Sequence, residues 1–166
     1  SYNLNNKKKK LVKEQEIPSG HNSKDYIVER LECESQDGRM VPLTITRHKK
    51  TKLDGTANLL LYGYGSYGSS MSPSFSSTKL SLINRDIIWV TAHIRGGMER
   101  GMKWWKEGKL LNKKNTFEDY IASAKYLIQN KYTSKNKIIG MGGSAGGLLM
   151  GAVVNQAPEL FLGMIM

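Results

Sequence analysis

The segment Gly142-Gly143-Ser144-Ala145-Gly146 decides the fold of this chain, because it places one serine between two apolar stretches. Residues 137–141 before it are typical of a short buried strand, and residues 148–158 after it are typical of an amphipathic helix. A sharp turn from strand to helix brings the two elements almost into contact, so the positions two before and two after the serine must be nearly free of side chains. We therefore predict a nucleophile elbow with Ser144 at its tip.

Such an elbow indicates acyl transfer through a covalent acyl-serine. The N-terminus of the following helix directs free backbone N–H groups toward the serine, which favours an anion that forms beside it. Glycine-rich turns between a strand and a helix also bind phosphate groups. No lysine follows these glycines as in a Walker loop, and no G-x-G-x-x-G opens the helix, so the sequence favours the elbow.

The composition is that of one globular domain with a hydrophobic core: 166 residues, of which 39% are hydrophobic and 23% charged. No stretch approaches the roughly 18 consecutive apolar residues that a membrane-spanning helix needs, and the first ten residues are polar, unlike a signal peptide. We therefore expect a cytoplasmic protein without a membrane partner. The single cysteine, Cys33, has no metal-ligand spacing around it, and we expect a reduced, buried thiol and neither a metal nor another cofactor.

The formal net charge of +11 comes mostly from lysine, with a run at residues 7–10 and further lysines at positions 49, 50, 113 and 114. A nucleic-acid surface would be expected to mix arginine and stacking aromatic residues with these lysines, and no known recognition motif is present. We interpret the lysines as solvated surface residues and expect no functional binding of nucleic acid.

The rest of the chain predicts an α/β fold. Residues 26–33 and 41–47 are predicted strands, joined through a hairpin turn at Gln36-Asp37-Gly38-Arg39. Residues 58–62 and 86–92 are apolar runs typical of strands that are buried on both faces. One or two helical turns are expected at 78–84, and a helix at 116–130 with Thr116 as its N-cap. The chain ends in the beginning of a further strand at 161–166, and the alternation predicts a mostly parallel sheet with helices on both faces.

Three blocks upstream of the elbow carry a family resemblance: residues 61–68 (LYGYGSYG), 92–101 (AHIRGGMERG) and 109–117 (KLLNKKNTF). Together with the elbow they closely resemble the prolyl oligopeptidase family of serine peptidases, and most of all its oligopeptidase B (protease II) group. The likeness extends from about residue 17 to the end of the chain. It implies an incomplete α/β-hydrolase fold in residues 18–166, preceded by a residual propeller-edge or hinge segment in residues 1–17.

The resemblance also assigns roles to residues. Ser144 would attack a peptide carbonyl, and the oxyanion would be held by the Ala145 N–H and the Tyr64 hydroxyl. Tyr62 and Tyr67 are interpreted as packing aromatics, and Arg95-Gly96-Gly97 as part of the wall of the site. The substrates implied are short peptides cleaved after Arg or Lys. A second acidic pair of the oligopeptidase B group would fall near Ser72 and Ser74, where this chain has hydroxyl groups, so a preference for paired basic residues is not expected.

The catalytic acid and base would follow the serine in the order Ser, Asp, His. All three histidines, His21, His48 and His93, precede Ser144, and the only carboxylate after it is Glu159. We expect His93 to be structural, and the isolated chain to have no measurable peptidase activity.

Several hypotheses remain open at this stage. Another polypeptide that carries the remaining strands, the Asp and the His would complete a split enzyme. Without it, the chain would be a non-enzymatic remnant with an exposed sheet edge. An esterase of the α/β-hydrolase class shares the elbow, although the Tyr-Gly-Tyr-Gly and Arg-Gly-Gly blocks argue against it. A lysine-dependent nucleic-acid binder would bind tightly even at moderate salt.

Overall fold

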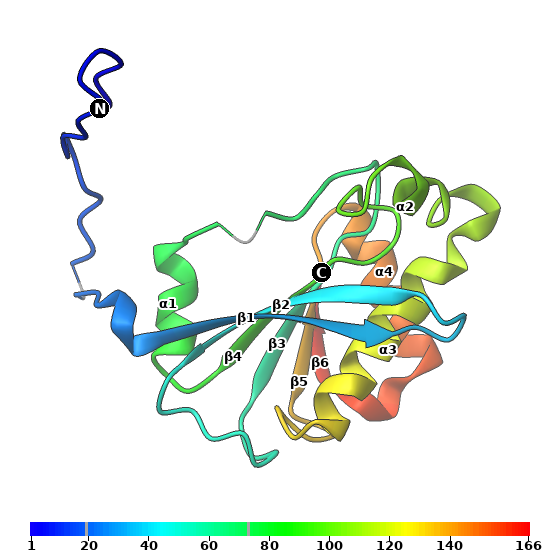
Figure 1. Cartoon of the computed structure of the whole chain (residues 1–166). Coiled ribbons are helices and arrows are strands. Elements are labelled where there is room, and N and C mark those ends of the chain that lie inside the picture. Colours follow the sequence, from blue (N-terminus) through cyan, green and yellow to red (C-terminus); the bar gives the residue numbers. More distant parts are fainter. Residues whose placement is uncertain (19, 73) are drawn as a thin grey trace.

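The computed structural model describes residues 1–18, 20–72 and 74–166 of the chain. These residues form a six-stranded sheet with the strand order β1-β2-β4-β3-β5-β6 (Figure 1). The strands are β1 (Tyr26–Glu34), β2 (Met40–His48), β3 (Leu59–Tyr62), β4 (Ile88–Ala92), β5 (Ile138–Met141) and β6 (Phe161–Ile165). All of them fall within one or two residues of the predicted strands.

The sheet is antiparallel at one side and parallel at the other. β2 pairs antiparallel with both β1 and β4, whereas β3 lies parallel between β4 and β5, and β6 runs parallel to β5. The carboxyl ends of β3 and β5 therefore meet at the same edge of the sheet. The predicted fold class, a mostly parallel α/β sheet with an antiparallel hairpin at its start, is confirmed.

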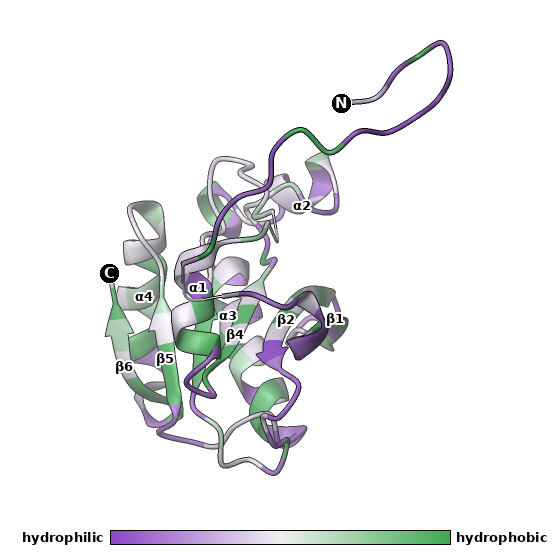
Figure 2. Cartoon of the chain, turned by 90° about the vertical axis from the view of Figure 1, so that its left-hand side faces the viewer, coloured by the Kyte–Doolittle hydropathy of each residue, from purple (hydrophilic) through white to green (hydrophobic). Residues whose placement is uncertain are grey.

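Helices cover both faces of this sheet, as predicted (Figures 1 and 2). The short helix α1 (Ser77–Ile83) lies on one face, against β2 and β4. The longer helices α3 (Lys114–Gln129) and α4 (Ala145–Gln156) lie on the other, where they enclose the main core with alternate residues of the strands, such as Leu43 and Ile45. Figure 2 shows the central strands as predominantly hydrophobic and the N-terminal segment as largely hydrophilic.

The short elements contribute Trp104 and Leu160 to this core, whereas residues 1–16 and 18 are exposed and extend away from the domain (Figure 1). The α2 helix (Met102–Lys106) follows β4 and was not predicted from the sequence. Single 3-10 turns occupy η1 (Ser23–Asp25), η2 (Leu110–Asn112) and η3 (Pro158–Leu160). Within the described residues, no helix combines the length and the apolar character needed to cross a membrane.

The predicted N-cap of the long helix is wrong. Helix α3 begins at Lys114, so Thr116 lies inside its first turn. The Thr116 hydroxyl is fully buried and is shared between two carbonyl oxygens, those of Arg95 at 2.9 Å and Gly108 at 3.1 Å. The threonine thus binds the helix to the loop after β4 instead of capping the helix.

A buried ion cluster holds this loop. Arg95 is 1% exposed, and its guanidinium pairs with the fully buried Asp119 of α3 and with Asp37 in the β1–β2 turn, each at 2.5 Å. The backbone N–H of Arg95 also donates to Asp119, at 2.9 Å. One side chain therefore joins three segments that are distant in the sequence.

Removing one partner of a buried ion pair leaves the other charge uncompensated. We therefore expect Asp119→Asn to lower the free energy of unfolding by about 3–5 kcal/mol, measured by urea denaturation of the isolated chain. The matched control is Glu32→Gln, which breaks the exposed pair with Arg100 and should cost no more than about 1 kcal/mol. Equal costs for the two variants would contradict a structural role for the cluster.

The same cluster predicts a pH dependence of stability. Hydrogen bonding to Arg95 holds the pKa of Asp37 below its ordinary value. A carboxyl whose pKa is depressed by folding contributes stability above its unfolded pKa of about 3.9 and loses it as the pH falls through the folded value. The stability difference between the wild type and Asp37→Asn should therefore shrink between pH 6 and pH 3. A difference that stays constant over this range, measured by urea denaturation, would contradict the assignment.

Candidate active site

Ser144 lies at the junction of β5 and α4 with φ 56° and ψ −119°, a backbone conformation that side-chain-bearing residues rarely adopt. The residue is exposed at the carboxyl edge of the sheet. A Cβ atom at Gly142 would lie 2.7 Å from the carbonyl oxygen of Gly146 and 2.8 Å from that of Gly63. Only glycine fits there, because the strand, the helix and the neighbouring strand end converge at this point. These are the backbone features of a nucleophile elbow.

Tyr64 lies beside this elbow. Tyr62 and Met141 are partners in the parallel register of β3 and β5, and the next residue, Gly63, donates its N–H to the Met141 carbonyl at 3.0 Å. A Cβ atom at Gly146 would lie 3.7 Å from Cδ2 of Tyr64. The half-buried Tyr64 and the exposed Ser144 therefore follow the ends of adjacent strands and lie close together.

Ala145 is the first residue of α4, and its N–H follows directly after Ser144. The N–H groups of Gly146 and Gly147 donate to the carbonyls of Gly143 and Ser144, both at 2.8 Å. These two N–H groups are therefore engaged, whereas the Ala145 N–H has no acceptor within the helix, and the helix dipole adds partial positive charge at this end. An oxyanion next to Ser144 would meet this positive end.

The loop after β4 packs behind the turn that carries Tyr64. A Cβ atom at Gly96, where φ is +96°, would lie 2.0 Å from the carbonyl oxygen of Gly65. The N–H of Gly68 also donates to the Gly96 carbonyl at 2.9 Å. Arg95 itself is buried in the ion cluster, and the loop contacts the turn that carries Tyr64 through Gly96.

His93 is enclosed by protein partners. It is 1% exposed, its Nε2 lies 2.8 Å from the Thr44 hydroxyl, and its Nδ1 lies 3.5 Å from a carboxylate oxygen of the buried Glu99. It follows β4, and β3 separates β4 from the elbow strand. These contacts support the structural role that the sequence analysis expected.

The other aromatic residues of the Tyr-Gly-Tyr-Gly block differ from one another. Tyr62 stacks on Trp89 with ring centroids 6.3 Å apart, as expected for a packing residue. Tyr67 is 80% exposed with φ 56°, so the interpretation of Tyr67 as a packing aromatic is wrong. Cys33 is buried, and burial raises the pKa of its thiol to about 11, which agrees with an unreactive core residue.

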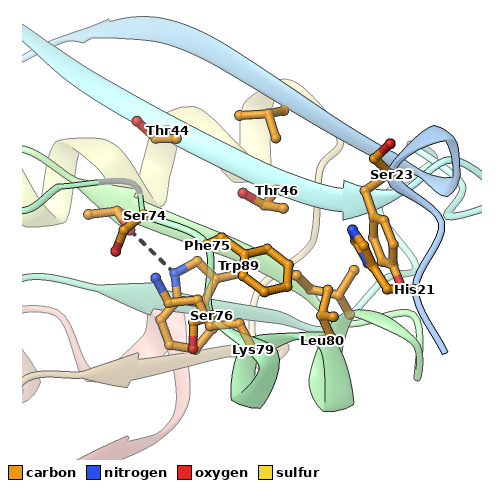
Figure 3. Close-up of a pocket in the computed structure, with 14 residues that line it drawn as sticks. His21, Ser23, Thr44, Thr46, Ser74, Phe75, Ser76, Lys79, Leu80 and Trp89 are labelled. Atoms are coloured by element: carbon orange, nitrogen blue, oxygen red, sulfur yellow. Dashed lines mark hydrogen bonds between the residues drawn. The ribbon is translucent and has the colours of Figure 1, made fainter. Parts of the chain in front are cut away.

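A separate cavity of about 260 Å³ lies between α1 and the sheet (Figure 3). It is lined by apolar and hydroxyl side chains, among them Phe75, Trp89 and Ser74, and neither Ser144 nor Tyr64 reaches it. Ser72 and Ser74, the positions considered for an acidic pair, flank Pro73, which lies outside the described residues. Across the described part of the chain, no three His, Cys, Asp or Glu side chains gather as metal ligands would.

A strand-to-helix elbow at the carboxyl edge of a mostly parallel sheet, with helices on both faces, defines part of an α/β-hydrolase catalytic domain. The sequence model of the prolyl oligopeptidase family matches residues 73–166, and the chain belongs to this family of serine peptidases.

Individual relatives support this assignment. The chain is 45% identical over 164 residues to dipeptidyl aminopeptidase BI of Pseudoxanthomonas mexicana, covering 97% of this chain and 22% of that protein. It is 43% identical over 159 residues to protease 2 of Moraxella lacunata, covering 96% of this chain and 23% of that protein. Oligopeptidase B from Trypanosoma brucei, solved with covalently bound antipain, superposes with a TM-score of 0.92 at 38% identity over 98% of this chain and 23% of that one. The chain thus spans about a fifth of the length of these relatives.

The strain at Ser144 predicts an unusual stability effect. Glycine adopts this conformation without steric cost, so Ser144→Gly should raise the free energy of unfolding by about 1 kcal/mol, whereas Ser144→Ala keeps the strain and should leave it nearly unchanged. The measurement is urea denaturation. The control is Ser70→Gly, at an exposed loop serine outside the positive-φ set, which should destabilise slightly. A loss of stability in Ser144→Gly as large as that of the control would contradict a strained elbow.

Proposed function

We propose that this chain carries the nucleophile and the oxyanion donors of a serine peptidase, with Ser144 as nucleophile and with the Tyr64 hydroxyl and the Ala145 N–H as donors. The observation that carries the proposal is the strained backbone of Ser144 beside Tyr64 at the carboxyl edge of the sheet. Membership of the prolyl oligopeptidase family supports peptides as substrates.

In the proposed reaction, Ser144 Oγ forms a bond to the peptide carbonyl carbon while its proton passes to a general base. The electron pair of the carbonyl moves onto oxygen, and the Ala145 N–H and the Tyr64 hydroxyl donate hydrogen bonds to that oxyanion. The C–N bond then breaks, the amine leaves with the proton, and water later cleaves the acyl-serine. A single oxyanion donor of this kind contributes a factor of about 10² to 10³ in kcat.

We propose that the aspartate and the histidine come from a further polypeptide segment, because no histidine follows Ser144 in this sequence and His93 is enclosed elsewhere. The edge strand β6 supports this proposal. Within the described sheet it pairs only with β5, and two of its apolar residues, Leu162 and Ile165, are 62% and 47% exposed. An exposed apolar edge accepts a further strand.

The same edge supports the second hypothesis, a non-enzymatic remnant. Without a completing segment, β6 would pair with other chains, and the protein would self-associate. We also propose that residues 1–17 are a residual propeller-edge or hinge segment and that residues 18–166 are a truncated catalytic domain. By resemblance to oligopeptidase B, the completed protein would cleave short peptides after Arg or Lys.

The proposal predicts complementation. The isolated chain should show no measurable peptidase activity, because loss of a triad member costs about 10⁴ to 10⁶ in turnover. Mixing it with the part of protease 2 of Moraxella lacunata that follows its matched region should restore cleavage of a fluorogenic Arg or Lys peptide. Activity should be lost in the mixture with Ser144→Ala.

The mixture also tests the oxyanion donor. Tyr64→Phe should lower kcat by about 10² to 10³, and Tyr62→Phe, at the neighbouring packing residue, should leave kcat nearly unchanged. A folded complex that is inactive would contradict the proposed function and favour the remnant. Activity that survives Ser144→Ala would contradict Ser144 as the nucleophile.

A further inference from the structure

The turn that carries Tyr64 has an unusual backbone. Within residues 65–68, Gly65, Tyr67 and Gly68 all have positive φ values, of 64°, 56° and 67°. For a tyrosine this conformation is unfavourable, and such conformations persist only where surrounding contacts impose them. The contacts that impose this turn therefore also determine where the adjacent Tyr64 side chain lies.

Lys113 supplies the charged contact to this turn. Its Nζ donates to the carbonyl oxygen of Gly65 at 2.6 Å and to the hydroxyl of Ser66 at 2.9 Å. The side chain is half-buried, and burial lowers the pKa of its ammonium group. The interpretation of Lys113 as a solvated surface lysine is therefore wrong.

A half-buried ammonium that exchanges part of its hydration for a carbonyl and a hydroxyl makes strong, charge-assisted hydrogen bonds. Here both acceptors belong to the two residues that directly follow Tyr64. The neighbouring Lys114 is exposed. Of these two adjacent lysines, Lys113 is therefore hydrogen-bonded to the turn, and Lys114 provides a matched control.

The position of Lys113 in the fold also favours its hydrogen bonds to the turn. Lys113 directly precedes α3, whose Thr116 and Asp119 are anchored to the loop after β4. In the same loop, the carbonyl oxygen of Gly96 accepts a hydrogen bond from the N–H of Gly68. The backbone of Lys113 is therefore held in place by the anchored start of α3, and its side chain contacts the turn at the end nearest Tyr64.

We infer that Lys113 is a positioning residue for the oxyanion site: by holding Gly65 and Ser66, it fixes the turn that directs the Tyr64 hydroxyl toward the carbonyl attacked by Ser144. This inference rests on the proposed function. Lys113 does not touch the substrate and acts only through the backbone of the turn.

The first test uses the isolated chain. Two amides report on the turn, because the N–H of Gly68 donates to Gly96 and the N–H of Ser69 donates to Ser66 at 3.0 Å. Lys113→Met should speed the hydrogen exchange of these amides at least about tenfold, while Lys114→Met should leave them unchanged and Lys113→Arg should keep most of the protection. Unchanged exchange in Lys113→Met would overturn the inference.

The second test is a double-mutant cycle in the complemented enzyme. Lys113→Met should lower kcat about 10- to 100-fold with little change in KM, since a misplaced catalytic group costs this much. In the Lys113→Met background, Tyr64→Phe should cost far less than it does in the wild type, because the two residues act as one unit. Lys113→Arg should recover part of the loss.

The outcomes separate the two proposals. If the fold losses in kcat of Lys113→Met and Tyr64→Phe simply multiply in the double variant of an active enzyme, the positioning role is wrong and the proposed function stands. If Tyr64→Phe has no effect in the wild-type background, Tyr64 is not an oxyanion donor. That result would overturn both the assignment of Tyr64 and the role of Lys113.

Discussion

The parallel pairing of β3 with β5 is the constraint on which the candidate site depends. It sets Tyr62 opposite Met141, so that the next residues of both strands leave the sheet side by side. Gly63 and Gly146 then crowd the elbow so closely that Gly142 has no room for a side chain, and a Cβ atom at Gly146 would lie 3.1 Å from the Gly63 carbonyl oxygen. The sharp turn at Ser144 and the location of Tyr64 both follow from this register. A shift by one residue would turn the side chains of either strand to the opposite face of the sheet and separate the two groups.

Around this pair, the supporting contacts are long-range and polar. Arg95 joins the β1–β2 turn to α3 through Asp37 and Asp119, and the loop that begins there packs against the Tyr64 turn. Lys113 holds the same turn from the start of α3. Ser144, in contrast, is fixed mainly by backbone geometry. The Ser144 side of the candidate site is therefore determined by glycines and local strain, and the Tyr64 side by the buried Arg95 cluster and the half-buried Lys113.

Sequence patterns predicted most of the fold because they reflect local physics. The continuous apolar runs marked the buried strands, and glycines on both sides of a serine marked the elbow. Other features depend on distant partners. Lys113 and Lys114 are chemically identical in the sequence, and only the path of the turn after Tyr64 decides which of them bonds to it. Thr116 resembled an N-cap, but its hydroxyl binds Arg95 and Gly108, and the five-residue α2 is too short to give a periodic pattern. The proximity of Tyr64 to the elbow came from the family resemblance rather than from residue periodicity.

The most direct measurement of the central claim is a crystal structure of the complemented protein after reaction with an arginine peptide aldehyde. We predict a covalent bond from Ser144 Oγ to the former aldehyde carbon. The hemiacetal oxygen should lie about 2.7–3.1 Å from both the Ala145 nitrogen and the Tyr64 hydroxyl. An adduct on another residue, or a hemiacetal oxygen held by other donors while the Tyr64 phenol points away, would contradict it.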